Sequence, residues 1–452
     1  MKRKQAETTT QEENASTLAG EAATSTANAE EASALKRPRE ATNPPQQEEK
    51  NKTDDGAAAV ALTEEDKNKW RVPKRKVALL IGYNGAEFAG MQRNPGVRTV
   101  EEELEKAIVE AGGIAPFNAG SFLKVNWSRC ARTDKGVHAV GNIISLKMLL
   151  EPEGMLDRIN AALPPDIRLF EIYRVTGTFG AKHSVDSRTY EYLLPFSCLL
   201  PENAAEEKDE ERRQRKRDEA IRRTNELLQK YVGHHNFFNF TSKKEKSDPS
   251  ALRYIISFTC SEPFMLDGME FVRLVINGQS FLLNQIRKMI GLVVLLVRKN
   301  LSEELIEMAY ELRYSIPMAP GEGLMLLHCL FDTYSNGRGS SLPPLDWRNA
   351  AEQMDEFKQR VIYPCIVKCE REAGVFKQWE SVLDGQEVDL EALRPQWEAE
   401  RQEEAKRKEE RERKKQERAA RRKLYEEAQR KEKEQQQQQK NEEEKKKEKE
   451  QD

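Results

Sequence analysis

The chain contains 452 residues, of which 33% are charged, but acidic and basic residues nearly cancel to a formal net charge of -3. Net charge therefore neither supports nor excludes a nucleic-acid partner, because it hides any local clustering of cations. The six cysteines form no CxxC pair and have no histidine at a zinc-site spacing, which argues against structural zinc and against a disulfide-rich secreted protein. We interpret them, including Cys365 and Cys369, as structural thiols in a reducing compartment and predict no metal.

The start of the chain and its apolar runs carry neither a signal peptide nor a membrane span, which predicts an intracellular, soluble protein. The first residues, Met-Lys-Arg-Lys, lack the apolar region of a signal peptide, and the apolar run 292–297 is too short to cross a bilayer. Basic clusters at 2–4, 36–39 and 74–76 are compatible with nuclear import. We expect the nucleus, with the cytoplasm and mitochondria as further candidate locations, and no membrane partner.

Composition separates a folded core from two tails. Residues 1–73 are rich in Ala, Thr, Glu, Gln and Asn and poor in aromatics, which predicts a disordered arm. Residues 391–452 are nearly all Glu, Lys, Arg and Gln, which is typical of a solvated helix or a disordered tail. Between the tails we expect three folded segments: an N-terminal subdomain at 74–195, a C-terminal subdomain at 196–345 with a charged insertion at 201–223, and a helical extension at 346–390.

The first part of the core shows a strand, a helix and then two further strand-like segments. An apolar run at 77–81 predicts a buried strand, and a helix with a capping box beginning at Thr99 follows it. Strand-like segments at 122–127 and 142–148 flank a polar loop at 129–136. Such a loop, held between two strands, keeps its side chains accessible and fixed in position.

The same alternation continues to residue 331. The predicted elements are a helix at 155–162, strands at 167–175, 187–194, 254–260 and 270–276, a helix with a broad apolar stripe at 281–297, and a final strand at 323–331. This order predicts an α+β fold. We expect two related halves, ferredoxin-like or RRM-like, that form a mixed, mainly antiparallel central sheet with a cleft between them, flanked by charged tails.

The polar loop carries the segment Arg132-Thr-Asp-Lys-Gly-Val-His-Ala139. From the residues alone, Asp-Lys-Gly is better interpreted as a turn with an Asx cap than as a catalytic site. The segment resembles the catalytic motif of TruA-type tRNA pseudouridine synthases, Arg-Thr-Asp-x-Gly-Val-His-Ala. Four other segments resemble motifs of that family in the same order, so the likeness extends over about 77–333: these are 83–92, 179–190, 280–291 and 320–324.

Several details resemble the eukaryotic tRNA pseudouridine synthase 1 branch of this family. They are Met91 in place of a tryptophan, Lys135 after the motif aspartate, and the aromatic segment 235–241. The chain departs from the family pattern in three places, none of which involves the motif aspartate: these are Ala86, His183 and Phe238. The departures bear on substrate preference rather than on the chemistry.

The resemblance implies roles for four residues and requires no cofactor. Asp134 is the catalytic carboxylate, acting at the sugar, at the uracil ring or first as a base. Tyr190 stacks on the target uracil. Arg287 pairs with Asp134, the alternative being an exposed arginine on the polar side of its helix. Arg132 assists base flipping or contacts phosphate. We expect Arg132 or Arg287 to lower the pKa of Asp134.

Seven further cations fall in or near the motif segments and are candidates to line a cleft for the RNA backbone, although each alone is typical of a solvated surface: Lys124, Arg129, Lys135, Lys182, Arg188, Lys288 and Arg298. His138 and His183 are interpreted as structural, because the chemistry needs no group that titrates near neutral pH. His234, His235 and the nearby phenylalanines fit a hydrophobic corner as well as a cleft border.

The function that the resemblance implies is isomerisation of uridine to pseudouridine in tRNA, at several sites in the anticodon stem and loop. Small nuclear RNA and messenger RNA are further candidate substrates, and the eukaryotic branch implies a monomer. Two alternatives stay open: a non-catalytic RNA-binding or RNA-folding protein on the same scaffold, and a scaffold protein acting through its charged tail. The tail lacks the apolar heptads of a stable coiled coil.

Overall fold

The computed structural model describes residues 70, 72–150, 153–201, 208–242 and 244–449. The arm predicted at 1–73 therefore falls almost wholly outside the described residues, as does part of the insertion predicted at 201–223. Within the described residues, no helix is both long enough and apolar enough to cross a membrane.

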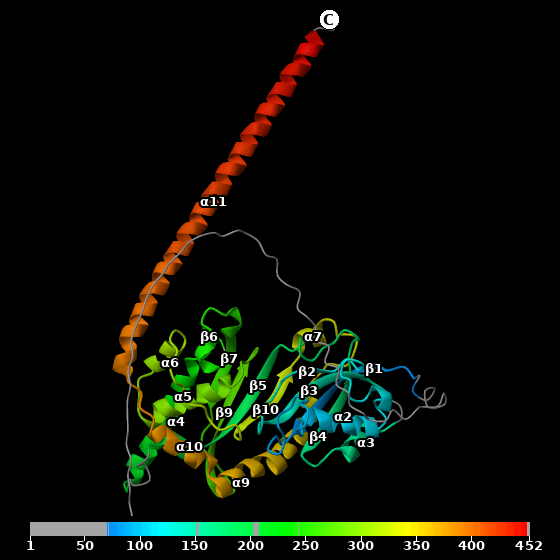
Figure 1. Ribbon diagram of the computed structural model, residues 1–452, viewed down its shortest axis with the longest axis vertical. Coiled ribbons are helices and arrows are strands. Elements are labelled where there is room, and N and C mark those ends of the chain that lie inside the picture. Colours follow the sequence, from blue (N-terminus) through cyan, green and yellow to red (C-terminus); the bar gives the residue numbers. More distant parts are fainter. Residues whose placement is uncertain (1–69, 71, 151–152, 202–207, 243, 450–452) are drawn as a thin grey trace, which may run out of the picture. The chain divides into compact units, whose positions relative to one another are not determined.

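A mixed, mainly antiparallel sheet lies at the centre of the fold (Figure 1). Its main path has the order β4-β1-β3-β10-β5-β9-β7-β6, with β2 paired to β3 and β8 paired to β9. The strands are β1 (Arg75–Tyr83), β2 (Ser128–Arg129), β3 (His138–Met148), β4 (Ile167–Arg174), β5 (Ser187–Pro195), β6 (Gly233–Asn236), β7 (Leu252–Cys260), β8 (Phe264–Leu266), β9 (Met269–Gly278) and β10 (Leu324–Leu330).

The two predicted halves are confirmed by the strand order. The first half runs β1, α2 (Val100–Glu110), β2, β3, α3 (Met155–Ala162), β4, and its strands lie in the order β4-β1-β3-β2. The second half runs β5, α4 (Glu210–Gln229), β7, β9, α5 (Gln285–Arg298), β10, in the order β10-β5-β9-β7. Each half is thus a β-α-β-β-α-β unit of the ferredoxin type with the same arrangement of strands.

The halves meet along one edge of β3. β10 pairs in parallel with only the first two residues of β3, at His138 and Ala139. β2 pairs farther along the strand, at Ile144 and Ser145. Because β1 occupies the opposite edge of β3, β2 and β10 share the remaining edge and diverge from each other. The chain between β2 and β3 leaves the sheet at this divergence, so the loop lies where the two halves join.

Two predicted elements differ from the structure. The segment 122–127 was expected to be a strand but forms turns, because Asn126 adopts a left-handed backbone with φ 51° and Phe122 stacks on Trp127 at 4.6 Å. The helix expected from residue 281 begins only at Gln285, since Asn284 before it is also left-handed, with φ 63°. Asparagine tolerates this conformation better than most residues, so it can interrupt a strand or delay a helix.

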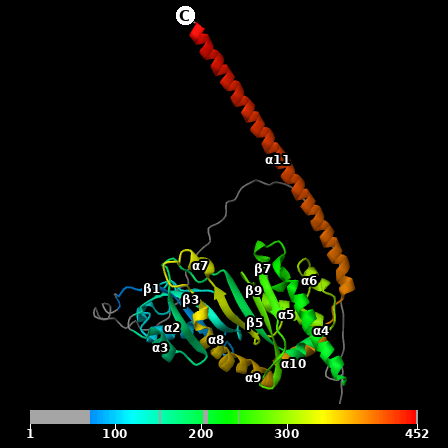
Figure 2. The same ribbon diagram turned by 180° about the vertical axis from the view of Figure 1, so that it is seen from behind.

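The segment after β10 forms helices that lie against the sheet, as Figure 2 shows for α8, α9 and α10. Phe357 of α8 contacts Phe170 of β4 edge to face. Tyr363 of α9 donates a hydrogen bond to Glu191 of β5. The helices of this region are α7 (Asp332–Asn336), α8 (Ala351–Phe357), α9 (Tyr363–Ala373) and α10 (Val375–Asp384), with α6 (Glu304–Ala309) earlier in the chain.

Short helical segments complete these connections: η1 (Pro116–Asn118), η2 (Phe196–Leu199), η4 (Phe238–Phe240), η5 (Pro249–Ala251), η6 (Trp347–Ala350) and the π-helical η7 (Lys358–Ile362). The final helix, α11 (Leu390–Lys449), adopts the first of the two alternatives for the charged tail, a solvated helix. Its first turns are attached to the folded core, since Trp397 is buried and Arg394 forms a salt bridge with Glu304 at 3.0 Å.

Candidate active site

The loop between β2 and β3 is held by buried hydrogen bonds from β1 and β3. Asn142 of β3 accepts a hydrogen bond from the Ala131 amide at 3.3 Å and donates to the Ala131 carbonyl at 3.1 Å. Thr133 shares a hydrogen bond with the Tyr83 hydroxyl at 2.8 Å. The Met91 amide donates to the Thr133 carbonyl at 3.1 Å. These contacts fix the backbone on the N-terminal side of Asp134.

Two glycines allow the backbone to follow this path. Gly136 has φ 80°, a left-handed conformation that closes the turn after Asp134. At Gly85 a Cβ atom would lie 2.1 Å from the Val137 carbonyl oxygen, so any other residue would displace the loop. The motif at 83–92 therefore supports the loop by close backbone approach rather than by chemistry.

His138 has the structural role expected from the sequence. Its Nδ1 accepts a hydrogen bond from the Gly85 amide at 3.0 Å, and its Nε2 contacts the Glu322 carbonyl at 3.0 Å. An acceptor at one ring nitrogen and a donor at the other define a neutral imidazole. Burial lowers the pKa of His138 to about 4, so the ring stays neutral at physiological pH and joins the loop to the segment before β10.

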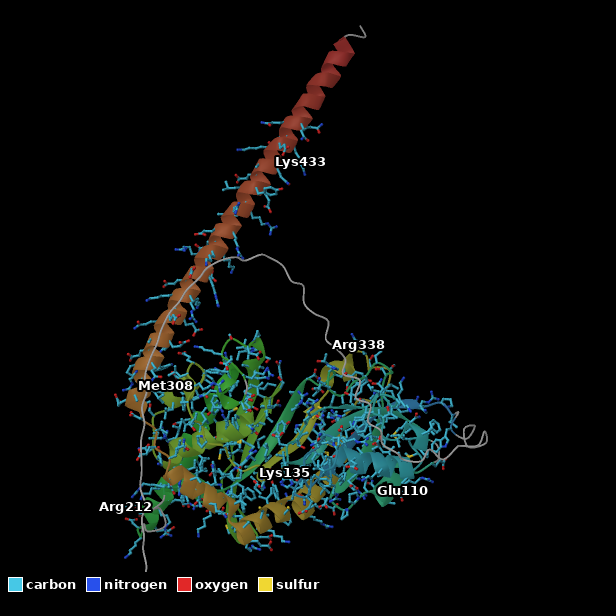
Figure 3. The ribbon with its side chains drawn as sticks, in the orientation of Figure 1. Glu110, Lys135, Arg212, Met308, Arg338 and Lys433 are labelled. Atoms are coloured by element: carbon cyan, nitrogen blue, oxygen red, sulfur yellow. The ribbon has the colours of Figure 1, made fainter. Side chains whose placement is uncertain are left out.

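The four predicted site residues line one pocket of about 1080 Å³ between the two halves. Asp134 and Arg132 come from the loop after β2, Tyr190 comes from β5, and Arg287 comes from α5. Figure 3 places Lys135, the neighbour of Asp134, between the first and second halves of the fold. The volume is at the upper end of the range for small-molecule sites, so the pocket can hold a base together with its ribose.

The environment of Asp134 differs from the sequence prediction. Its side chain is open to the pocket, yet partial burial raises the pKa of Asp134 above its ordinary value, and the positive charge of Arg287 opposes this rise. The prediction of a lowered pKa is therefore wrong in its net direction. Arg287 acts in the expected sense, but the loss of hydration is the larger effect.

Arg287 is partly buried and fixed by the segment that follows α6. Its Nε donates to the Ala319 carbonyl at 2.7 Å, and its own carbonyl accepts from the Ala319 amide at 3.1 Å. The guanidinium lies beside Gly321, where a Cβ atom would be 3.5 Å from Cζ. Among the described residues Arg287 forms no direct salt bridge with Asp134, so its positive charge acts on that carboxylate electrostatically at longer range.

Tyr190 forms one wall of the pocket. Its side chain is 7% exposed, and its ring meets Phe281 edge to face at 5.3 Å and 85°. Burial raises the pKa of Tyr190, which keeps the phenol neutral. Phe281 also lines the pocket and was not singled out from the sequence. The only signal for it was its place in the motif at 280–291, before the start of α5.

Arg188 has a positioning role that the sequence did not reveal. It precedes Tyr190 by two residues on β5, so both side chains project from the same face of the strand. Its guanidinium donates to the Cys130 carbonyl at 2.9 Å and to the Gln279 carbonyl at 2.7 Å. Arg188 therefore connects the Asp134 loop with the segment that leads into α5.

The other predicted cations fall into distinct environments. Arg129 and Lys182 line the pocket, but Arg129 is paired with the fully buried Glu101. Lys288 donates to the Asn239 carbonyl at 3.0 Å. Arg298 is not part of the cleft: its side chain, 5% exposed, forms a salt bridge with Asp384 at 2.6 Å, so that prediction is wrong. A cation in an apolar helix needed a partner, and here the C-terminal extension supplies it.

Two further observations concern possible metal ligands and the aromatic segment that begins in β6. Among the described residues no group of three or more His, Cys, Asp or Glu side chains is placed to hold a metal ion. His235 stacks on Tyr310 at 4.4 Å, and Phe237 and Phe240 are buried in the same aromatic cluster. The segment 235–241 is thus a hydrophobic corner, one of the two interpretations left open by the sequence.

Comparisons with known proteins agree with this site. The family model for tRNA pseudouridine synthase matches residues 227–332. The chain is 41% identical over 327 residues to the Pseudouridylate synthase 1 homolog of Mus musculus, covering 71% of this chain and 76% of that protein. It is 40% identical to the human protein of the same name, covering 68% and 72%. It is 35% identical to tRNA pseudouridine synthase 1 of Eremothecium gossypii, covering 72% and 76%. The chain belongs to the tRNA pseudouridine synthase family.

Proposed function

We propose that the protein isomerises uridine to pseudouridine in tRNA, with Asp134 as the central catalytic group. The observation that carries this proposal is the meeting of Asp134, Tyr190 and Arg287 in one pocket, although they come from three elements far apart in the chain. An ionised carboxylate, a neutral aromatic ring and a fixed cation are the groups that the reaction needs. No redox change occurs, so the pocket requires no electron carrier.

The reaction breaks the N1–C1′ bond of uridine, rotates the base and forms a C5–C1′ bond, after which the proton on C5 moves to N1. Ionised Asp134 can attack C1′, attack the uracil ring, or first remove a proton, and each route begins from the carboxylate. Tyr190 stacks against the freed base and keeps it from leaving the pocket. Arg287 favours the ionised form of Asp134 throughout.

A uridine in a base-paired stem must leave its stack before it can enter this pocket. Arg132 lies at the pocket with an exposed side chain, and we propose that it holds the displaced strand. The proposed targets are several uridines of the anticodon stem and loop, with small nuclear and messenger RNAs as further substrates. We further propose a monomer that acts in the nucleus.

The test uses purified protein, an unmodified tRNA transcript and buffer without added metal or cofactor. Pseudouridine is detected as a carbodiimide-dependent stop of reverse transcription. The protein should form pseudouridine, and Asp134→Asn should lower the rate by about 10⁴-fold or more while keeping RNA affinity. A folded protein that modifies none of several RNAs would exclude the enzyme, and an active Asp134→Asn variant would favour an RNA-folding protein instead.

A further inference from the structure

Helix α11 concentrates positive charge in one stretch, although the whole chain carries a net charge of -3. Residues 405–423 include four glutamates, at 409, 410, 412 and 417. The same stretch includes eleven lysines and arginines, which gives a net charge of 11 − 4 = +7: Lys406, Arg407, Lys408, Arg411, Arg413, Lys414, Lys415, Arg418, Arg421, Arg422 and Lys423.

Helical periodicity places most of these cations on one face. Arg407, Arg411, Lys414, Arg418 and Arg421 follow one another at spacings of four and three residues, which align on an α-helix. Three more lie beside this row at spacings of seven. Of the four glutamates, Glu410, Glu412 and Glu417 border this face, and Glu409 lies on the opposite side of the helix. We call these eight residues the basic stripe: Arg407, Lys408, Arg411, Lys414, Lys415, Arg418, Arg421 and Arg422.

The rest of the described chain does not cover the stripe. Residues 401–437 are all exposed. Four stripe residues form salt bridges within the helix itself, such as Lys414 with Glu410 at 2.6 Å and Arg422 with Glu426 at 2.8 Å. Such exposed pairs are weak and leave the cations accessible to another anion. Among the described residues, Arg411, Arg418 and Arg421 form no salt bridge.

The start of α11 fastens the stripe to the half of the fold that carries α5. Trp397 is 8% exposed, and Lys246 forms a salt bridge with Glu400 at 2.8 Å. The stripe begins about 15 Å beyond Trp397 along the helix and extends for about 22 Å, at a rise of about 1.5 Å per residue. A polyanion held in the pocket therefore meets the stripe at a high effective concentration, because the helix that carries the stripe is anchored to the same protein.

We propose that the basic stripe binds the phosphate backbone of the same RNA whose uridine enters the pocket. This inference rests on the proposed function, which supplies a polyanionic substrate. Arginine and lysine repeated along one helix face suit a row of phosphates. A membrane surface fits less well, since a helix lying in an interface needs an apolar face, and the uncharged residues of 405–423 are alanines and one glutamine.

The test compares two variants of the full-length protein, each lacking three positive charges of α11. The stripe variant is Arg411→Gln/Arg418→Gln/Arg421→Gln. The matched control removes three cations that lie off the stripe, and is Lys406→Gln/Arg413→Gln/Lys423→Gln. Glutamine keeps the helix propensity close to that of lysine and arginine, and circular dichroism checks the helix content of both proteins.

Affinity for an unmodified tRNA is measured by fluorescence anisotropy at several salt concentrations, together with the kinetics of pseudouridine formation. The stripe variant should bind about tenfold more weakly, and its salt dependence of log K should fall by about 2–3, or about 0.7–0.9 per lost phosphate contact. Its KM should rise while kcat stays unchanged. The control should stay within about twofold of the unmodified protein, because its changes lie off the stripe.

Equal affinities for all three proteins would overturn the inference, as would equal losses in both variants, which would show a net-charge effect without a defined face. The inference would also be overturned, in favour of a membrane partner, if the stripe variant bound vesicles of anionic lipid more weakly than the unmodified protein does but kept its affinity for tRNA. These results are separable from the proposed function, because pseudouridine formation by the unmodified protein is measured in the same experiment. A protein that forms no pseudouridine contradicts the function itself.

Discussion

At the scale of single residues, the pKa of the Asp134 carboxyl group depends on the balance between its burial and the positive charge of Arg287. Burial raises the pKa of Asp134, and Arg287 lowers it. Removing the positive charge should therefore raise the pKa of Asp134 further. Because the reaction needs the ionised carboxylate, activity is lost as the pH falls through this pKa.

We predict that Arg287→Gln shifts the acid limb of the kcat/KM profile to higher pH, whereas Arg287→Lys, which keeps the charge, largely restores its position. Rates are measured from about pH 4 to about pH 8, which spans the ordinary pKa of an aspartate and neutral conditions. Thermal unfolding of each variant separates this effect from a loss of fold, since Arg287 also binds the Ala319 carbonyl. An acid limb that does not move in Arg287→Gln contradicts the account.

The sequence predicts which residues form the site, but not their electrostatic environment or their distant partners. The motifs were sufficient to select Asp134, Tyr190 and Arg287, and all three line the same pocket. The direction of the pKa shift of Asp134 was not predictable, because it follows from how much of the pocket wall surrounds the carboxylate. The partner of Arg298 was missed for a similar reason: Asp384 lies 86 residues away in the chain.

At the scale of elements, the loop after β2 is held in place by Asn142. This side chain is fully buried and bonds both the amide and the carbonyl of Ala131, three residues before Asp134. Asn160 of α3 makes the same pair of bonds to Leu169 of β4. Asn160 is not among the residues that line the pocket, so it offers a control for the loss of the same pair of hydrogen bonds away from the site.

We predict that Asn142→Ala lowers the free energy of unfolding by about 1–3 kcal/mol and lowers kcat by about 10- to 100-fold, because the freed loop misplaces the carboxylate. Asn160→Ala should also destabilise the fold, though less, because Asn160 is only partly buried and makes two hydrogen bonds, and it should leave kcat within about twofold of the unmodified protein. Urea unfolding and single-turnover rates measure the two quantities. Equal kcat values for the two variants would mean that Asn142 does not position Asp134.

Element boundaries were less predictable than element types. Apolar periodicity located the strands that became β1, β5 and β10, because a buried face imposes the pattern. It failed at 122–127 because this segment forms consecutive turns in which Phe122 stacks on Trp127, while Leu123 is 94% exposed. The left-handed residues Asn126 and Asn284 are single-residue events that a periodicity cannot register.

At the scale of the whole molecule, the C-terminal extension is joined to the second half by a buried ion pair. Arg298 of α5 binds both carboxylate oxygens of Asp384 in α10, at 2.6 and 2.7 Å. The hydrogen bond from Arg298 lowers the pKa of Asp384. A lowered folded-state pKa stabilises the fold above the unfolded pKa of about 4, and this stability is lost as the pH falls through the folded-state pKa.

We predict that Asp384→Asn lowers the free energy of unfolding by about 2–3 kcal/mol at neutral pH, because it leaves the Arg298 charge buried and partly unpaired. The difference from the unmodified protein should shrink below about pH 4, as Asp384 itself becomes protonated. Asp355→Asn removes an exposed partner of Lys358 and should cost less than about 0.5 kcal/mol. A deficit of Asp384→Asn that stays constant down to about pH 2 would contradict the assignment.

The two-half architecture was predictable because each half repeats the same order of strand and helix patterns. The way in which the halves join was not, since the parallel contact of β10 with β3 involves only two residue pairs from distant parts of the chain. This short contact nevertheless creates the divergence at which the Asp134 loop emerges. The position of the pocket thus follows from topology, whereas its chemistry follows from local motifs.

The most direct test of the central claim is a structure of the Asp134→Asn variant bound to an unmodified tRNA. We predict a uridine turned out of its stem, with its uracil against the Tyr190 ring and its ribose beside residue 134, while Arg287 stays in its present position. An RNA bound with this pocket empty, or with its target base held away from residues 134 and 190, would contradict the account.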